Sequence, residues 1–284
     1  MFVISGASGN TGGAAAKALL AQGQAVRVIV RDAKKGADWK ARGAEVAVAE
    51  LSDTAALTAA LRGADGVYVM LPPNHQADDL LATQATLIAS WAAALQAAKP
   101  KHVVMLSSVG AELASGTGPI VGNHRLEAAL GSLGMARTAV RAAYFMENWG
   151  AVVHPAKADG ILPSMLTLGR AAGMVATADI GRVAAEALVA GAAAERVIEL
   201  AGPRDYTPEE VAAAFARVLG RPVQVVPVPD AAIEPALLQA GMKPKMAALF
   251  REMVGGFNAG RIAFKGAPRR GLVGVEDVVR GLVG

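Results

Sequence analysis

FVISGASGNTGG, residues 2–13, joins a short apolar strand to a helix through a glycine-rich loop. In such a loop Gly6 allows a tight turn, Gly9 lets the backbone approach a pyrophosphate, and Gly12 lets the helix pack close to the strand. The helix N-terminus adds free N–H donors and the positive end of the helix dipole. The stretch therefore predicts a dinucleotide-binding loop, with a glycine turn that binds nothing as the alternative. The loop residues expected to contact the cofactor are Gly6, Ser8, Gly9, Asn10, Thr11 and Gly12.

Short β-branched runs alternate with alanine-rich segments through the first half of the chain. Strands are expected at residues 2–5, 25–30, 45–49, 67–71, 102–106 and 135–141, with helices between them. This alternation predicts an α/β fold, a doubly wound, mostly parallel Rossmann sheet with helices on both faces. We expect residues 1–143 to form an NAD(P)-binding domain. Residues 144–284 should form mainly a smaller substrate lobe, with one strand at about 197–201 rejoining the sheet.

The composition limits the classes of partner. The 284 residues include 28 Lys and Arg against 24 Asp and Glu, a net charge of +4, and these charges are interspersed. A nucleic-acid-binding surface needs clustered basic residues, so it is not expected, whereas an anionic small molecule is. With no cysteine, disulfides and thiolate chemistry are excluded. His75 and His154 are expected in loops and His102 at the start of a strand, a spacing that predicts no metal site.

No membrane segment is expected. The uncharged stretch 80–98 contains scattered polar residues, which is not typical of a membrane span. Residues 1–5 lack the basic region and the long apolar core of a signal peptide. We therefore expect a cytoplasmic protein.

The residues after the second strand bear on the choice of cofactor. An arginine there can pair with the 2′-phosphate of NADP, whereas a carboxylate would bind the ribose hydroxyl of NAD. The chain offers Arg31, with Lys34 and Lys35 close behind, and also Asp32. Two cations suit a dianionic phosphate, so NADP(H) is predicted in preference to NAD(H). The alternative is a solvated loop in which Asp32 binds an NAD ribose.

Two further loops are candidates for binding the adenosine half of the cofactor. Glu50 follows the third strand, where it could hold the adenine amino group, while Asp53 is better explained as a helix N-cap. Leu71 and Pro72 follow the fourth strand and could line the adenosine ribose. A proline pair that merely ends the strand explains them equally well.

The motifs GASGNTGG (6–13), VRDAKK (30–35), HVVMLSSVGAE (102–112) and RAAYFMENW (141–149) occur in that order. Together with ADIG (178–181) and LAGPRDYTP (200–208), each expected before a helix, they resemble the NmrA-like family of atypical short-chain dehydrogenase/reductases. That family includes NADPH-dependent quinone and dye reductases and also regulators that bind NADP without turnover. The resemblance implies that Ser107 and Ser108 lie beside the nicotinamide and that Tyr144 and Phe145 flank it.

The usual acid-base pair of short-chain dehydrogenases, a Tyr-x-x-x-Lys motif, is absent from the sequence. Tyr68, Tyr144 and Tyr206 are followed four residues later by proline, asparagine and glutamate. No lysine occurs between Lys101 and Lys157, so a lysine-based variant is missing as well. Proton transfer must therefore depend on another group or on solvent.

The expected helix that starts at Pro119 supplies the best substitutes. Asn123 and Glu127 share one helical face, and His124 and Glu127 are neighbours at i and i+3. We therefore expect His124 to donate a proton, with its basicity raised by Glu127, and Asn123 to bind the cofactor ribose or a substrate carbonyl. Alternatively, His124 packs at the surface and Glu127 is a solvated helix charge. Tyr144 is the third catalytic candidate.

Aromatic side chains suggest the kind of acceptor. Residues 144–149 (YFMENW) follow the sixth strand and could form an apolar wall for a flat, conjugated substrate, or could equally be core. Met242, Met246, Phe250, Met253 and Phe257 recur at helical spacing and are interpreted as lobe core or a homodimer contact. The sequence thus favours an NADPH-dependent reductase of quinones or similar molecules. The alternative is a non-catalytic NADP(H) sensor that binds a protein partner.

Overall fold

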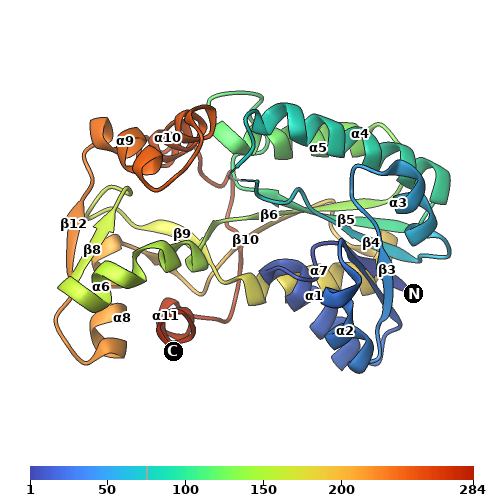
Figure 1. Ribbon diagram of the computed structural model, residues 1–284, viewed down its shortest axis with the longest axis horizontal. Coiled ribbons are helices and arrows are strands. Elements are labelled where there is room, and N and C mark those ends of the chain that lie inside the picture. The colour runs from blue at the N-terminus through green and yellow to red at the C-terminus, as the bar shows by residue number, and fades with distance from the viewer. Residues whose placement is uncertain (75) are drawn as a thin grey trace.

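An eight-stranded parallel sheet forms the centre of the protein (Figure 1). The computed structural model describes residues 1–74 and 76–284, so the expected loop position of His75 lies outside the described residues. The strand order is β13-β10-β6-β5-β4-β1-β2-β3, and every neighbouring pair is parallel. The predicted doubly wound sheet is thereby confirmed. The strands are β1 Phe2–Ile4, β2 Val26–Val30, β3 Glu45–Val48, β4 Gly66–Val69, β5 His102–Ser108, β6 Arg137–Ala142, β10 Val197–Ala201 and β13 Arg269–Arg270.

Helices cover both faces of this sheet because its strands are apolar on both sides. Along β2, for example, Val28 packs toward one layer of helices and Ile29 toward the other. The first layer contains α1 Asn10–Ala21, α2 Ala37–Ala41 and α7 Thr177–Ala190. The second contains α3 Thr54–Leu61, α4 Leu80–Ala98 and α5 Val121–Gly131. Pro119 lies in a short 3-10 turn, Gly118–Ile120, that leads into α5.

Glycines allow α1 to lie unusually close to its neighbours. A Cβ at Gly12 would stand 2.4 Å from the carbonyl oxygen of Ser5, at the end of β1. A Cβ at Gly181 of α7 would stand 2.3 Å from the Cβ of Ala14. Both distances are shorter than van der Waals contact, so these positions require glycine. The expected packing role of Gly12 follows directly from this geometry.

Helix α4 is the candidate for a membrane span among the described residues, by length and composition alone. It packs between α3 and α5, and it buries Trp91 and Leu95 in the core between this helix layer and the sheet. Two of its polar side chains, Gln84 and Ser90, are buried as well. Because a core helix satisfies the same criteria, α4 is explained by its packing.

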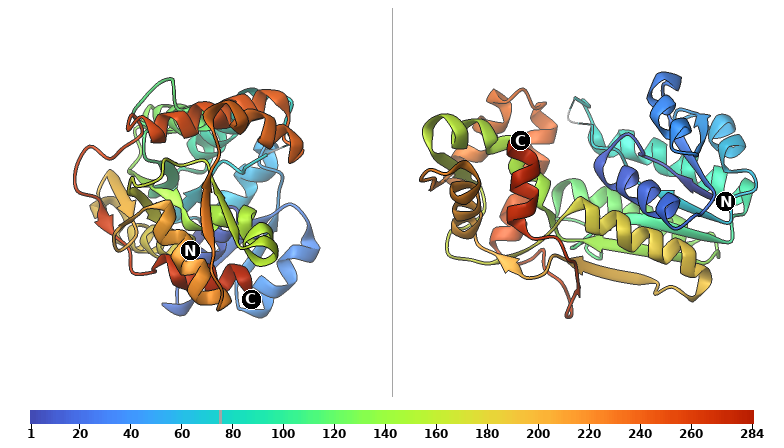
Figure 2. Two further views of the ribbon diagram at one scale, coloured as in Figure 1. Left: turned by 90° about the vertical axis from the view of Figure 1, so that its left-hand side faces the viewer. Right: turned by 90° about the horizontal axis from the view of Figure 1, so that it is seen from below.

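The second half of the chain builds a lobe beyond the carboxyl ends of the strands, as Figure 2 shows in its right-hand view. A three-stranded sheet, β11-β9-β7, and a two-stranded sheet, β12-β8, lie in this lobe around a core of their own. Its strands are β7 Tyr144–Phe145, β8 Ile161–Ser164, β9 Ala172–Val175, β11 Asp205–Tyr206 and β12 Gln224–Pro227. Its helices are α6 Val153–Asp159, α8 Pro208–Leu219, α9 Asp230–Gln239, α10 Pro244–Asn258 and α11 Val275–Val283.

The two halves of the chain are interleaved. The expected strand β10 pairs with β6, and α7 and β13 from the second half also belong to the sheet layers. The domain boundary at residue 143 stays a prediction. Three local expectations are wrong: His154 lies in α6 rather than a loop, residues 178–181 lie inside α7 rather than before it, and Met242 lies in the turn before α10.

The chain returns from α10 to the sheet through residues 259–270, here named the strap. Glu199 on β10 accepts the backbone N–H groups of Lys265 and Gly266 at 3.3 and 3.4 Å. Beyond the strap, the buried carboxylate of Asp179 accepts the N–H groups of Leu272 and Val273 at 2.8 and 2.9 Å. These contacts fix the path of the chain across the lobe.

Candidate functional site

The glycine loop lies at the N-terminus of α1, at the carboxyl end of β1. Gly6 has φ +65°, which favours glycine, and Gly9 caps the helix with an extended backbone and no side chain. The first intrahelical bond runs from the N–H of Gly13 to the carbonyl oxygen of Gly9 at 3.1 Å. The N–H groups of the first helical turn have no intrahelical acceptor, so the loop can hold an anion.

The predicted loop residues differ in exposure. Ser8, Gly9 and Asn10 are exposed, whereas the side chain of Thr11 is buried beside the hydroxyl of Tyr68. Burial raises the pKa of Tyr68 above its usual range. Thr11 can therefore contact a cofactor through its backbone, while its side chain belongs to the core.

A pocket of about 550 Å³ opens beside the loop. Ser8, Gly9 and Asn10 line it, together with Lys17 of α1 and Trp39 of α2. Asn10 and Lys17 are seven residues apart and so share one helix face. Lys17 was missed by the sequence reasoning, although this spacing from the loop was available as a signal.

The end of β2 presents positive charge to solvent. Arg31 and Lys35 are exposed, and neither has an ion-pair partner among the described residues. The carboxylate of Asp32 is engaged: it accepts the N–H of Lys34 at 2.9 Å and caps the turn Ala33–Gly36. The arrangement leaves two cations available for an anionic ligand and gives Asp32 a structural role.

The loops expected near the adenosine are at the same edge of the sheet. Glu50 is exposed just after β3, and Leu71 and Pro72 are half-buried after β4. Asp53 accepts the N–H of Ala56 at 3.0 Å, so its interpretation as the N-cap of α3 is confirmed.

A largely buried polar network lies at the end of β5. Ser107 donates to Glu127 at 2.5 Å, and Glu127 accepts two hydrogen bonds from Arg141 at 3.0 and 2.7 Å. Arg141 also pairs with Glu112 at 3.4 Å, and the hydrogen bond to Glu127 raises the pKa of Arg141. Ser107 therefore faces α5, while Ser108 is the half-exposed serine of the pair. The interpretation of Glu127 as a solvated charge is wrong.

The side chains of Asn123 and His124 contact the same region. Asn123 donates through Nδ2 to the carbonyl oxygen of Leu106 at 3.3 Å. The Nδ1 atom of His124 lies 2.9 Å from the carbonyl oxygen of Ala111, which assigns a proton to Nδ1 and leaves Nε2 available. The expected pairing of His124 with Glu127 is wrong, because Glu127 bonds to Ser107 and Arg141 instead.

Tyr144 stands where the lobe meets the sheet. Its half-buried ring makes edge contacts with Trp149 and Phe257, with centroids 6.2 and 6.0 Å apart. Burial raises the pKa of Tyr144 to about 12, opposed by a hydrogen bond from Asn148. Tyr144 thus stays protonated near neutral pH and cannot serve as a base. Phe145 is half-buried against the sheet core, while Trp149 belongs to the lobe core.

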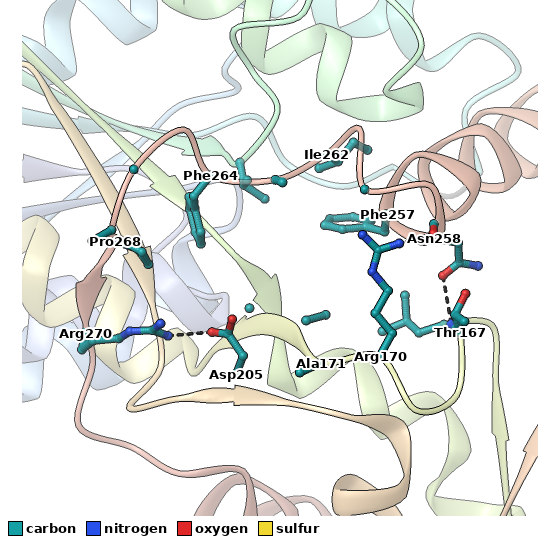
Figure 3. Close-up of a pocket in the computed structure, with 18 residues that line it drawn as sticks. Thr167, Arg170, Ala171, Asp205, Phe257, Asn258, Ile262, Phe264, Pro268 and Arg270 are labelled. Atoms are coloured by element: carbon teal, nitrogen blue, oxygen red, sulfur yellow. Dashed lines mark hydrogen bonds and ion pairs between the residues drawn. The ribbon is translucent and has the colours of Figure 1, made fainter.

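A second cavity, of about 440 Å³, lies between β9, α10 and the strap (Figure 3). Val109, which directly follows Ser108, lines it, and so does Phe257, whose ring contacts Tyr144. The interpretation of Phe257 as core or dimer contact was therefore incomplete, because this ring lines the cavity. Arg170 and Phe264 also line it, and no motif could have found them because only the folded strap brings them together.

No group of three or more His, Asp or Glu side chains among residues 1–74 and 76–284 could hold a metal ion.

The sequence model of the NmrA-like family matches residues 1–262, so the chain belongs to this family. The chain is 28% identical to an NAD(P)H azoreductase of Xenophilus azovorans over 286 residues, which cover 100% of this chain and 93% of the relative. It is 30% identical to (4-alkanoyl-5-oxo-2,5-dihydrofuran-3-yl)methyl phosphate reductase of Streptomyces griseus over 225 residues, 79% of this chain and 76% of that relative.

Two solved structures with the same fold are named as reductases. The NADPH-dependent quinone oxidoreductase of Escherichia coli, determined with NADPH, has a TM-score of 0.85 at 23% identity, with 100% of both chains covered. The triphenylmethane reductase of Citrobacter sp. has a TM-score of 0.83 at 18% identity, with 99% of both chains covered. The comparisons confirm the predicted family, fold class and oxidoreductase class.

Proposed function

We propose that the protein is an NADPH-dependent reductase that transfers a hydride to a quinone or a similar flat, conjugated acceptor without a Tyr-Lys pair. The observation that carries the proposal is the anion-binding loop at α1 together with the hydrogen-bonding groups of Asn123, His124 and Tyr144 at the neighbouring strand ends, in a sequence without a Tyr-x-x-x-Lys motif. The two curated relatives, both reductases, support the same class of reaction.

The residues of the loop fit a dinucleotide. The first-turn N–H groups of α1 would bind the pyrophosphate, and the absence of a side chain at Gly9 leaves room for its approach. Arg31 and Lys35 would bind the 2′-phosphate of NADP, because both cations are exposed and unpaired among the described residues. The preference for NADP over NAD rests on these two side chains and on the engagement of Asp32 with Lys34.

Bound NADPH supplies a hydride from C4 of its nicotinamide ring, and a quinone that takes up this hydride and one proton becomes a hydroquinone. The protein's contribution is then mainly orientation of the two reactants. The Nε2 atom of His124 is available for proton transfer, because its Nδ1 atom is hydrogen-bonded to the carbonyl oxygen of Ala111. Asn123, Ser108 and Tyr144 offer hydrogen-bonding groups beside the same strand ends.

The network of Ser107, Glu127 and Arg141 positions these groups. It ties the end of β5 to α5 and β6 through charge-assisted hydrogen bonds. Because Asn123 and His124 lie on the same helix as Glu127, the network fixes their place relative to the strand end. We assign it a positioning role.

The test is consumption of NADPH by the purified protein with menadione and with an uncharged azo compound, compared with NADPH alone. The proposal expects acceptor-dependent oxidation of NADPH and no more than slow oxidation without acceptor. Tight NADP binding without turnover, across a panel of quinones, azo dyes and enones, would overturn it. That result would favour the alternative, a non-catalytic NADP(H) sensor with a protein partner.

A further inference from the structure

The cavity between β9, α10 and the strap combines apolar walls with one unneutralised guanidinium. We propose that it binds an aromatic carboxylate, and that the acceptor's anionic end occupies it with Arg170 as the charge partner. The assignment of this ligand as the acceptor rests on the proposed reductase function. The binding of the aromatic carboxylate itself does not.

The shape of the cavity suits a flat aromatic body. Phe257 of α10 and Ile262 and Phe264 of the strap converge on it from one side, as Figure 3 shows. Ala171, just before β9, lies on the other side, where its small side chain leaves space. A volume of about 440 Å³ falls within the range of small-molecule sites. The apolar walls therefore favour an aromatic ring system of modest size.

The charge at the cavity is positive by one unit. Arg270 is neutralised by Asp205, whose carboxylate lies 2.7 Å away. Arg170 has no carboxylate partner among residues 1–74 and 76–284. The charged side chains that line the cavity, among the described residues, are Arg170, Asp205 and Arg270. Because Asp205 and Arg270 neutralise each other, Arg170 supplies the net charge. A single anionic group on the ligand would balance it.

Arg170 is held in place before any ligand binds. Its Nη1 donates to the carbonyl oxygen of Asn258, and a Cβ at Gly260 would stand 2.3 Å from its Nη2. Asn258 is itself fixed, because its amide accepts the N–H of Thr167 at 3.0 Å and donates to Met165 at 2.8 Å. A guanidinium has five N–H donors, so most remain for a planar carboxylate, which suits two parallel hydrogen bonds.

The cavity is placed to serve the reaction. Val109, which lines it, directly follows Ser108 at the end of β5, and the ring of Phe257 both lines the cavity and contacts Tyr144. A ligand anchored at Arg170 and extending past Phe257 would reach the strand ends where the nicotinamide is expected. The acceptor would thus be an elongated aromatic molecule with a carboxylate at the end remote from the reacting group.

The test compares the naphthoate anion with its uncharged isostere naphthamide, measured by calorimetric binding to the purified full chain. Wild-type protein should bind naphthoate more tightly. Arg170→Gln should weaken naphthoate binding about tenfold, the order expected for loss of a charge-assisted hydrogen bond. Its binding of naphthamide should be unchanged.

Two further variants control the result. Arg196→Gln removes an exposed arginine that directly precedes β10 and has no ion-pair partner in the part of the chain that the structure describes, and it should leave naphthoate binding unchanged. Ala171→Phe fills the cavity and should weaken naphthoate and naphthamide alike. Equal binding of the two ligands by wild-type protein, or equal effects of Arg170→Gln and Arg196→Gln, would overturn the proposal.

Inhibition of menadione reduction separates this proposal from the reductase function. Naphthoate should compete with menadione, and the competition should weaken in Arg170→Gln. Arg170-dependent naphthoate binding in a protein that reduces no acceptor would uphold the binding site and overturn its role as acceptor site. Menadione reduction without any naphthoate binding would uphold the reductase and overturn the site. Non-competitive inhibition would contradict the placement of the acceptor.

Discussion

Replacing Arg31 with glutamine should weaken NADP binding about tenfold and leave NAD binding nearly unchanged. Arg31 is exposed at the end of β2 and has no ion-pair partner among the described residues, so its charge is available to a phosphate. The variant removes this charge but no contact that stabilises the fold. The 2′-phosphate is the group that distinguishes NADP from NAD, so the effect should be confined to NADP.

The expected magnitude follows from the exposure of Arg31. An exposed ion pair contributes up to about 1 kcal/mol, and a hydrogen bond to a charged group about 1.5–3 kcal/mol. An intermediate value of about 1.4 kcal/mol corresponds to a tenfold change in the dissociation constant. Lys35→Gln should have a smaller effect in the same direction, since a lysine offers no planar pair of donors.

The assay is a calorimetric titration of NADP and NAD into wild-type protein and each variant at fixed ionic strength, because salt screens exposed charges. Arg196→Gln serves as the matched control, since it removes an exposed arginine far from this edge of the sheet. Unchanged NADP binding in Arg31→Gln would show that Arg31 does not contact the 2′-phosphate. A loss of NAD binding in Asp32→Asn would show that Asp32 contacts the ribose despite its bond to Lys34.

Four further predictions concern the loop, the tyrosine, the chain return and the N-terminus. Gly12→Ala should destabilise the protein by about 1–3 kcal/mol, as overpacking does, and should abolish NADP binding, which thermal unfolding and titration would detect. Tyr144→Phe should change kcat only a few-fold, and it should remove no ionisation below pH 10 from the pH profile of the wild-type rate, because the pKa of Tyr144 is raised to about 12. A large loss of kcat would make Tyr144 an essential acid. Asp179→Asn should lower stability by about 1–3 kcal/mol in a thermal melt, because its buried carboxylate accepts two backbone N–H groups that follow β13; an unchanged melting temperature would contradict this. The pKa of Asp65 is lowered from 3.8 to about 2 by its hydrogen bond to Lys101 and by the N-terminal ammonium, so its stabilising effect is complete above the unfolded pKa and is lost as pH falls through the folded pKa. Asp65→Asn should therefore lose less stability than the wild type between pH 3.8 and about pH 2 in an acid titration. Identical acid unfolding of the two proteins would contradict this prediction.

The parallel sheet could be predicted because its determinants are local. The glycine loop and the alternating apolar strands each carry their signal within a few residues, so β1 to β6 and β10 lie close to their expected positions. The two-residue strands β7, β11 and β13 could not be predicted, because so short a segment has no periodicity and is defined only by its partner. β7 and β11 are placed by pairing with β9, whereas β13 is placed by pairing with β10 and by the contacts of Asp179 with the residues that follow it.

The site was harder to predict because side-chain direction depends on distant partners. Helical spacing correctly put Asn123 and Glu127 on the same face, toward the end of β5. The same spacing wrongly paired Glu127 with His124, since Arg141 on β6 provides a stronger partner. Arg170 had no sequence signal, because its environment is assembled from β9, α10 and the strap.

NADPH-dependent reduction of a quinone is tested by following NADPH oxidation in the presence of menadione, with NADP and NAD binding titrated on the same preparation. We expect tighter binding of NADP than of NAD and oxidation of NADPH that depends on menadione. Tight NADP binding with no oxidation by menadione or by any other quinone, azo or enone acceptor would contradict this expectation.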